Sequence, residues 1–117
     1  MNTDIYKLIA LDQCNKSTYK KRMGAVVVNS KRIVGKGYNK VHSTGLLLDG
    51  KHAELEALYN TKAKNREGSV VYVCRITKLG ELALAKPCPA CQTVMKKMGV
   101  KYVWYSTDAD WIRMSLT

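Results

Sequence analysis

Two short segments constrain how this chain can fold, because their side chains have to meet at one place. One segment carries His52 and Glu54 at the start of an apolar helical pattern, and the other carries Cys88 and Cys91 at the start of another helix. One imidazole and two thiols suit Zn²⁺ by their softness. Three protein ligands leave a fourth tetrahedral position for water, which is the pattern of a catalytic zinc site. The sequence therefore predicts two helix starts that share one metal ion.

The second segment is suited to metal binding by its spacing and its prolines. Cys88 and Cys91 lie three residues apart, which places both on one helical face. Pro87 and Pro89 flank the first thiol, and proline is tolerated in a first helical turn, where the backbone N–H groups lack partners. Because a helix N-terminus carries positive potential, it lowers thiol pKa values. We therefore expect both cysteines to bind the metal as thiolates.

Glu54 favours catalysis over a purely structural zinc site. It follows His52 by two residues at a helix start, where the chain is not yet fully helical, so the two side chains need not diverge. A carboxylate in that place can take a proton from a water on the metal. It can then pass the proton to a substrate as a general acid.

Two other interpretations of the cysteines remain open from the residues alone. One is a closed structural zinc site, for which Cys14, Cys74 and His42 are available as a fourth ligand. The other is a C-x-x-C redox pair. The closed site leaves Glu54 without a role, and the redox pair also leaves His52 unexplained. We expect Cys14 to be a buried or idle thiol.

Hydrophobic periodicity predicts helices and strands in alternation, which is typical of an α/β layered sheet. The helices are expected at residues 3–13, 52–64 and 88–98. The strands are expected at residues 23–28, 32–39, 69–76 and 101–105. The first two strands read as an antiparallel hairpin, and the last two as parallel neighbours joined across the third helix.

Several smaller features add to this pattern. Gly35 and Gly37 indicate a bulge or a close backbone approach. Residues 77–82 indicate a hairpin-like excursion, and residues 108–116 fit either an edge strand or a short helix. Leu46–Leu48 lie in the predicted loop of residues 40–51 and suggest a lid, a contact surface or a short buried turn.

Size and composition bound the class of protein. A chain of 117 residues suits a single domain spanning 1–117, and 46% hydrophobic with 25% charged residues is ordinary for a globular protein. No apolar run approaches the ~20 residues of a membrane span, and the first residues lack a signal-peptide pattern. We therefore expect a cytoplasmic protein in a reducing compartment, with its four cysteines serving as ligands or core residues.

The net charge of +11 indicates an anionic partner. Twenty Lys and Arg residues oppose nine Asp and Glu residues, and no acid lies between Asp12 and Asp49. Such a field attracts phosphates, whether on a nucleotide or on a polymer. A basic surface that serves solubility alone is the competing interpretation.

An H-x-E motif at His52 and a P-C-x-x-C motif at Pro87 together resemble the zinc-dependent cytidine and deoxycytidylate deaminase superfamily. The resemblance covers roughly residues 22–106. It implies a three-layer α-β-α sandwich with a mixed sheet of about five strands. It also implies hydrolytic deamination, in which a water activated by zinc replaces the amino group of the base and ammonia leaves.

The resemblance assigns roles to individual residues. It implies that His52, Cys88 and Cys91 bind Zn²⁺ and that Glu54 shuttles the proton. The segment that ends at Asn39 resembles the family segment whose Asn often contacts the substrate sugar.

Two residues are thus candidates for substrate binding. Asn39 is one, although it equally suits the plain end of a strand. Ala53, between the predicted ligand and the predicted proton shuttle, is the other.

Several features narrow the branch of the superfamily. A histidine as first ligand is similar to deoxycytidylate, tRNA adenosine and polynucleotide cytidine deaminases, and unlike the free-cytidine enzymes. Residues 35–39 and 52–55 look most like deoxycytidylate deaminases and their phage-type relatives. The segment Val73–Pro87 is longer than is usual, and no extra metal-binding insertion is present. Regulation by a nucleoside triphosphate is therefore not expected.

The expected function is deamination of cytosine to uracil in a nucleotide or nucleoside such as dCMP. The alternative substrate is cytosine, or with less support adenine, in single-stranded DNA or RNA, because basic and aromatic side chains suit strand binding. A non-catalytic, zinc-stabilised nucleic-acid-binding module is the alternative outside the enzymes. The superfamily often assembles, which leaves a homo-oligomer open.

Overall fold

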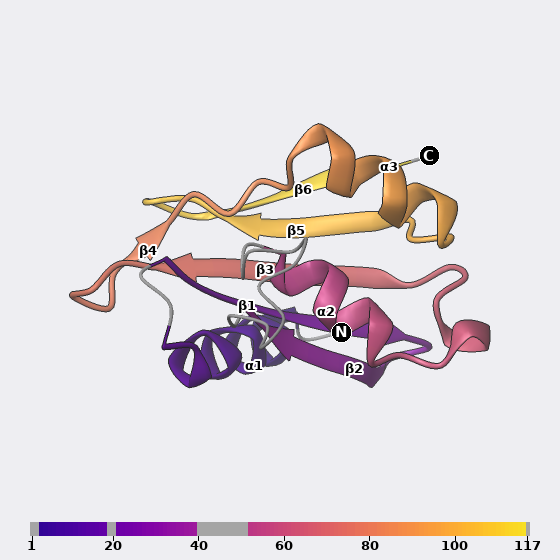
Figure 1. Ribbon diagram of the computed structural model, residues 1–117, viewed down its shortest axis with the longest axis horizontal. Coiled ribbons are helices and arrows are strands. Elements are labelled where there is room, and N and C mark those ends of the chain that lie inside the picture. Colours follow the sequence, from indigo (N-terminus) through magenta and orange to yellow (C-terminus); the bar gives the residue numbers. More distant parts are fainter. Residues whose placement is uncertain (1–2, 19–20, 40–51, 117) are drawn as a thin grey trace, which may run out of the picture.

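The computed structural model describes residues 3–18, 21–39 and 52–116, which form a six-stranded sheet with helices on both faces (Figure 1). The strands are β1 (Arg22–Asn29), β2 (Arg32–Tyr38), β3 (Val70–Ile76), β4 (Leu82–Ala83), β5 (Tyr102–Ser106) and β6 (Trp111–Ser115). The helices are α1 (Thr3–Lys16), α2 (Ala53–Tyr59) and α3 (Pro89–Lys97). The predicted α/β sandwich is confirmed, and the two-residue strand β4 brings the sheet from about five strands to six.

The sheet is mixed, with strand order β2-β1-β3-β5-β6 and with β4 beside the end of β3. β1 pairs antiparallel with both β2 and β3, so the predicted hairpin is confirmed. β3 and β5 are parallel neighbours, and α3 lies in the connection between them, as the sequence predicted. The ambiguous C-terminal segment is a strand, β6, that pairs antiparallel with β5 at the edge of the sheet.

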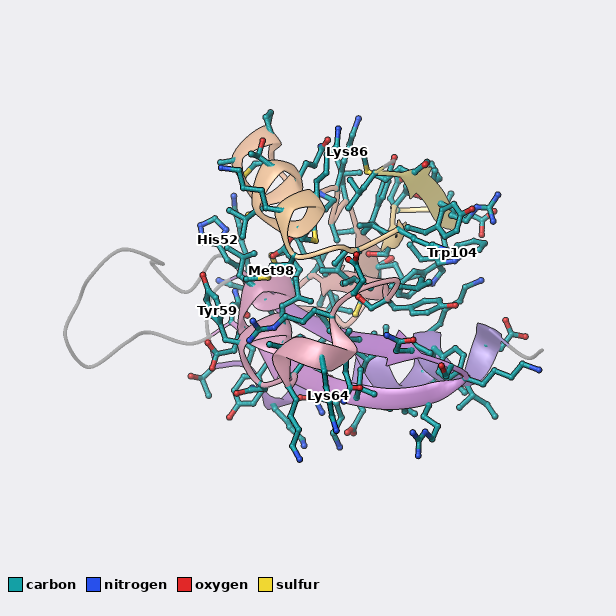
Figure 2. The ribbon with its side chains drawn as sticks, turned by 90° about the vertical axis from the view of Figure 1, so that its right-hand side faces the viewer. His52, Tyr59, Lys64, Lys86, Met98 and Trp104 are labelled. Carbon is teal, nitrogen blue, oxygen red and sulfur yellow. The ribbon has the colours of Figure 1, made fainter. Side chains whose placement is uncertain are left out.

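The central strands are buried on both faces, which explains their near-continuous apolar runs. Ala25 and Val27 of β1 pack in the core that lies under α2 and α3. Val26 and Val28 face the opposite way and pack in the core under α1. Figure 2 shows this division, since Met98 at the end of α3 and Trp104 of β5 lie on opposite sides of the sheet.

Two glycines of β2 let α2 lie directly on the strand. A Cβ atom on Gly35 would lie 2.6 Å from the carbonyl oxygen of Ala57, and one on Gly37 would lie 2.5 Å from the Ala57 nitrogen. The strand register also shifts here, because Val34 is an extra residue opposite β1. The predicted bulge and close approach are therefore both present, and they fix the position of the helix that carries the first part of the site.

Two helix ends differ from the prediction. α1 continues to Lys16 and so includes Cys14. α2 ends at Tyr59 and not near residue 64, because side chains bind the free carbonyls of its last turn. Thr61 Oγ1 donates to the Ala57 carbonyl at 2.8 Å, and Arg66 Nε donates to the Leu58 carbonyl at 2.9 Å. A short 3₁₀ turn, Ala63–Asn65, follows.

Some predictions fall outside the described residues. These are the loop of residues 40–51, its Leu46–Leu48 segment and His42. Among the helices that are described, none has the length and apolar character needed to cross a membrane.

Candidate active site

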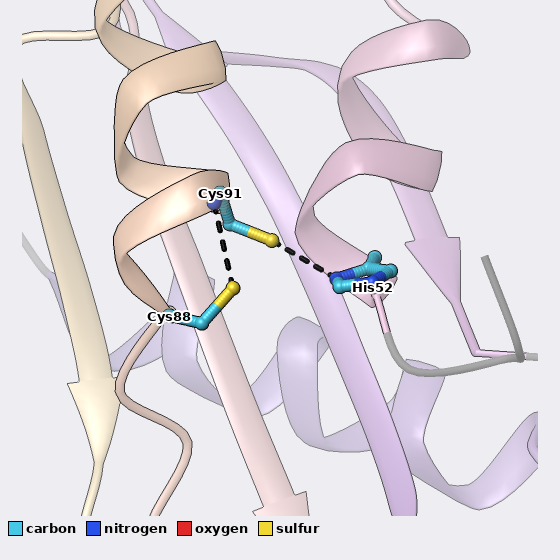
Figure 3. A group of neighbouring side chains, drawn as sticks. All are labelled: His52, Cys88 and Cys91. Atoms are coloured by element: carbon cyan, nitrogen blue, oxygen red, sulfur yellow. Dashed lines mark hydrogen bonds between the residues drawn. The ribbon is translucent and has the colours of Figure 1, made fainter. Parts of the chain in front are cut away.

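The three predicted metal ligands converge between the starts of α2 and α3 (Figure 3). The ligand atoms of His52, Cys88 and Cys91 all lie within 4.8 Å of one another, and His52 Nδ1 is 2.9 Å from Cys91 Sγ. Around a tetrahedral zinc ion, nitrogen and sulfur ligand atoms lie about 3.6–3.8 Å apart. The 4.8 Å limit includes this spacing, whereas the 2.9 Å contact between His52 and Cys91 is a hydrogen bond and is shorter than it. One nitrogen and two sulfur donors this close together suit a single Zn²⁺ ion once that hydrogen bond is replaced by the metal.

Local backbone structure places each ligand. Cys88 is the N-cap residue of α3 with extended backbone angles, and its sulfur accepts the N–H of Cys91 at 3.5 Å. Pro89 occupies the first turn, as the sequence predicted. His52 is the residue before α2, with non-helical φ and ψ angles of −125° and 67°. Both predicted helix starts are therefore present, and each carries its ligand just before or within the first turn.

The pKa of the Cys91 thiol departs from the prediction. Burial raises this pKa well above that of an ordinary thiol, and the nearby Glu54 carboxylate raises it further. The expected lowering by the helix N-terminus is therefore outweighed in the metal-free protein. A divalent cation reverses this balance, because a coordinated thiol is held as the thiolate.

Glu54 lies in the first turn of α2, 2% exposed, and lines the same cavity as the three ligands. Burial raises its pKa from 4.5 to about 7, against a smaller lowering by its own backbone N–H. Its Oε1 atom is buried and has no hydrogen-bond partner among the described residues. A carboxyl group with a pKa near neutrality can both accept and donate a proton, which is the property that acid–base catalysis requires.

A cavity of about 630 Å³ opens beside these side chains, a volume in the range of small-molecule sites. Asn39 lines it, but its side chain is bonded within the protein. Its Oδ1 accepts from Ser17 Oγ at 2.6 Å and from the Met23 N–H at 2.8 Å, and its Nδ2 donates to the Lys21 carbonyl at 2.6 Å. Ala53 is fully buried and is not one of the cavity-lining residues. Substrate binding by both residues stays a prediction.

Some of the residues that line the cavity were not predicted from the sequence. Arg75 of β3 and Met23 of β1 are directly paired and both line it. The lining also includes residues 84–87, the end of the segment that is longer than usual for the resembled family. Strand alternation could have found Arg75, because it follows Val71 and Val73 on the same face of β3.

The remaining cysteines lie away from the metal ligands. Cys14 and Cys74 are fully buried in the core under α1, where the Cys14 thiol donates to the Cys74 carbonyl at 3.3 Å. A closed zinc site that uses either thiol is therefore excluded, and the prediction of a buried Cys14 is confirmed. Among the residues that the structure describes, the group of potential metal ligands consists of His52, Cys88 and Cys91.

A family model, described as the cytidine and deoxycytidylate deaminase zinc-binding region, matches residues 3–107. A search of curated proteins found no significant match. Among solved structures, the dCMP deaminase from the cyanophage S-TIM5, in complex with dCMP and dUMP, is 28% identical with a TM-score of 0.65. That match covers 90% of this chain and 82% of the phage protein. The cytidine deaminase from Burkholderia pseudomallei shares the fold, with a TM-score of 0.69 at 22% identity over 99% of this chain and 94% of the other.

Proposed function

The chain belongs to the cytidine and deoxycytidylate deaminase zinc-binding family, and we propose that it deaminates the cytosine base of a nucleotide or nucleoside such as dCMP. One observation carries the proposal. The buried, unpartnered carboxyl oxygen of Glu54 faces the same cavity as the His52, Cys88 and Cys91 group. The 28% identical phage protein, which is a dCMP deaminase, supports dCMP as the first substrate to test.

The cofactor is Zn²⁺, since the family model describes a zinc-binding region and the three donor atoms fit that ion. In the proposed mechanism His52, Cys88 and Cys91 would hold the ion, which would supply a water of lowered pKa to the cavity. Glu54 would take one proton from the water and deliver it to the ring nitrogen of cytosine, while the water oxygen bonds to the carbon that carries the amino group. Glu54 would then take the second proton from the hydroxyl now on that carbon and deliver it to the amino group, which leaves as ammonia and leaves uracil. Burial of the carboxyl group keeps its pKa near neutrality and suits both steps.

A substrate panel tests this function. The zinc-loaded protein is incubated with cytidine, deoxycytidine, CMP, dCMP and single-stranded oligonucleotides that contain one cytosine, and ammonia release is measured. We expect turnover of at least one monomeric substrate. Turnover of oligonucleotides without turnover of any monomer would contradict the proposal.

The second candidate is deamination of a base within single-stranded DNA or RNA, and the net charge of +11 supports it. The two candidates differ in their dependence on salt. Binding to a strand weakens steeply with salt because several phosphates release counterions, whereas binding to one nucleotide weakens little. Measuring KM at 50 mM and 200 mM salt for the active substrate therefore separates them.

A further inference from the structure

The cavity beside the predicted zinc site carries more positive charge than deamination requires. Its lining includes the cationic side chains of Lys21, Arg75 and Lys86, and Glu54 is the acidic residue among the described residues that line it. Bound Zn²⁺ would be balanced by the two thiolates, so it does not neutralise this excess. A cavity with this balance favours a ligand that carries negative charge.

Arg75 occupies an unusual place for a cation. Val71 and Val73 precede it on the same face of β3 and pack in the core under α2 and α3. Strand alternation directs Arg75 to that face too, where it lines the cavity together with Met23, its partner on β1. An arginine on the inner face of a central strand is costly to bury unless another group binds it.

Among the described residues, none forms a hydrogen bond with Nε of the Arg75 guanidinium group. This nitrogen atom is buried. The ion pair found among those residues joins Lys7 and Asp4, on α1. A buried donor of this kind is normally satisfied by protein, water or a ligand. Arg75 Nε therefore lacks a protein partner among the described residues, and the side chain that carries it lines the cavity, where its guanidinium can meet an anion.

The backbone that carries the cations is held in place. The Arg75 N–H donates to Ser106 Oγ at 3.1 Å, and the Ser106 hydroxyl donates to the Ala83 carbonyl at 2.8 Å. The Ala85 N–H donates to the Ser106 carbonyl at 2.9 Å, directly before Lys86. One fully buried serine thus links β3 to the cavity wall, and the arginine and one lysine are positioned together.

We propose that Arg75 binds the phosphate monoester of a nucleoside monophosphate, with the exposed Lys21 and Lys86 adding to the binding field. The inference rests on the proposed function and names the substrate class of that site. Arginine presents a planar fork of donors that matches phosphate oxygens. A phosphate monoester carries about −1.5 to −2 charges at pH 7, which suits three cations better than an uncharged nucleoside does. The cavity volume of about 630 Å³ suits a single nucleotide.

Arg75→Gln tests the inference through substrate selectivity. We compare kcat/KM for dCMP and for deoxycytidine in the wild type, Arg75→Gln, Arg75→Lys and the control Arg32→Gln, an exposed arginine of β2. The ratio of dCMP to deoxycytidine should fall at least about 30-fold in Arg75→Gln, because the phosphate loses a charged partner. In Arg75→Lys, which keeps the positive charge but lacks the planar fork of donors, this ratio should fall less. In Arg32→Gln the ratio should stay at the wild-type value. An equal loss on both substrates would overturn the inference.

A binding measurement separates this inference from the proposed function. Titration calorimetry compares dUMP with deoxyuridine as ligands of the wild type and the Arg75 variants, all checked for folding by thermal melting. Arg75-dependent binding of dUMP without turnover of any cytosine substrate would support the phosphate site and remove the deaminase proposal. If the protein turns over dCMP but both Arg75 variants bind dUMP as the wild type does, the deaminase proposal stands and the phosphate site at Arg75 is overturned. Activity on oligonucleotides without activity on dCMP would overturn the monophosphate assignment.

Discussion

Replacing Glu54 with glutamine removes a buried charge and, in the proposed mechanism, the proton shuttle. The effect on stability can be measured apart from the effect on catalysis in the metal-free protein, because turnover requires the metal. The pKa of Glu54 is raised from 4.5 to about 7 by burial, which corresponds to about 3 kcal/mol of unfavourable free energy for the ionised form. The folded protein therefore binds more protons than the unfolded chain between these two pH values. Its stability should fall as the pH rises through this window.

Glu54→Gln lacks this titration. In chelator-treated, reduced protein, urea unfolding at pH 4, 5, 6, 7 and 8 should give a difference between variant and wild type that is constant below pH 4.5. The variant should then gain up to about 3 kcal/mol of relative stability by pH 8. The exposed Glu81→Gln serves as the matched loss of a carboxylate elsewhere and should show no such trend. Parallel curves for Glu54→Gln and the wild type would refute the argument from burial.

In the zinc-loaded protein the same variant tests catalysis. Glu54→Gln should keep its bound metal, measured by elemental analysis, while turnover falls roughly 10²–10⁴-fold because the general acid and base is lost. Unchanged activity in the metal-loaded variant would favour the non-catalytic, zinc-stabilised module. The stability curve and the activity loss are independent, so one can fail without the other.

Three further predictions concern the zinc ligand Cys88, the close packing of α2 on Gly37 and the hydrogen-bonded side-chain amide of Asn39. Cys88→Ser should lose zinc and lower the melting temperature to that of chelator-treated wild type, since saturating zinc at 1,000 times its dissociation constant adds about 4 kcal/mol. Gly37→Ala should lower the free energy of unfolding by roughly 1–3 kcal/mol in urea titrations, because its Cβ would meet the Ala57 backbone; an unchanged midpoint would contradict that packing. Asn39→Ala should destabilise the metal-free fold by about 1–3 kcal/mol, because Ser17, Met23 and Lys21 all lose their hydrogen bond to the buried amide. Asn39→Ala with wild-type stability and a raised KM would instead favour a pure substrate contact.

The sequence predicted the parts of the site that depend on local order. His52, Cys88 and Cys91 follow from ligand chemistry and from helix-start signals, and such signals act within a few residues. Glu54 was also predicted from local sequence, because it lies two residues from the ligand His52 and a purely structural zinc site would leave it without a role. The paired strands were predictable because β-rich runs and turn residues mark them directly.

The sequence did not predict the parts that depend on long-range packing. Strand alternation places Arg75 on the inner face of β3, but whether that face opens to a cavity depends on where residues 84–87 lie in the fold. The direction of the Cys91 pKa shift depends on how deeply α3 packs, which outweighs the local helix effect. The early end of α2 depends on Arg66, which reaches back to a carbonyl eight residues earlier.

The parallel pairing of β3 with β5 also has a kinetic consequence. The β1–β2 and β3–β4 hairpins join strands that are neighbours in sequence, and such local pairs form quickly. The β3–β5 pair must instead wait for closure of the long connection that contains Cys88, Cys91 and α3. Zinc should therefore bind tightly only after this slow step, and stopped-flow zinc uptake during refolding should lag behind the gain of β-sheet circular dichroism.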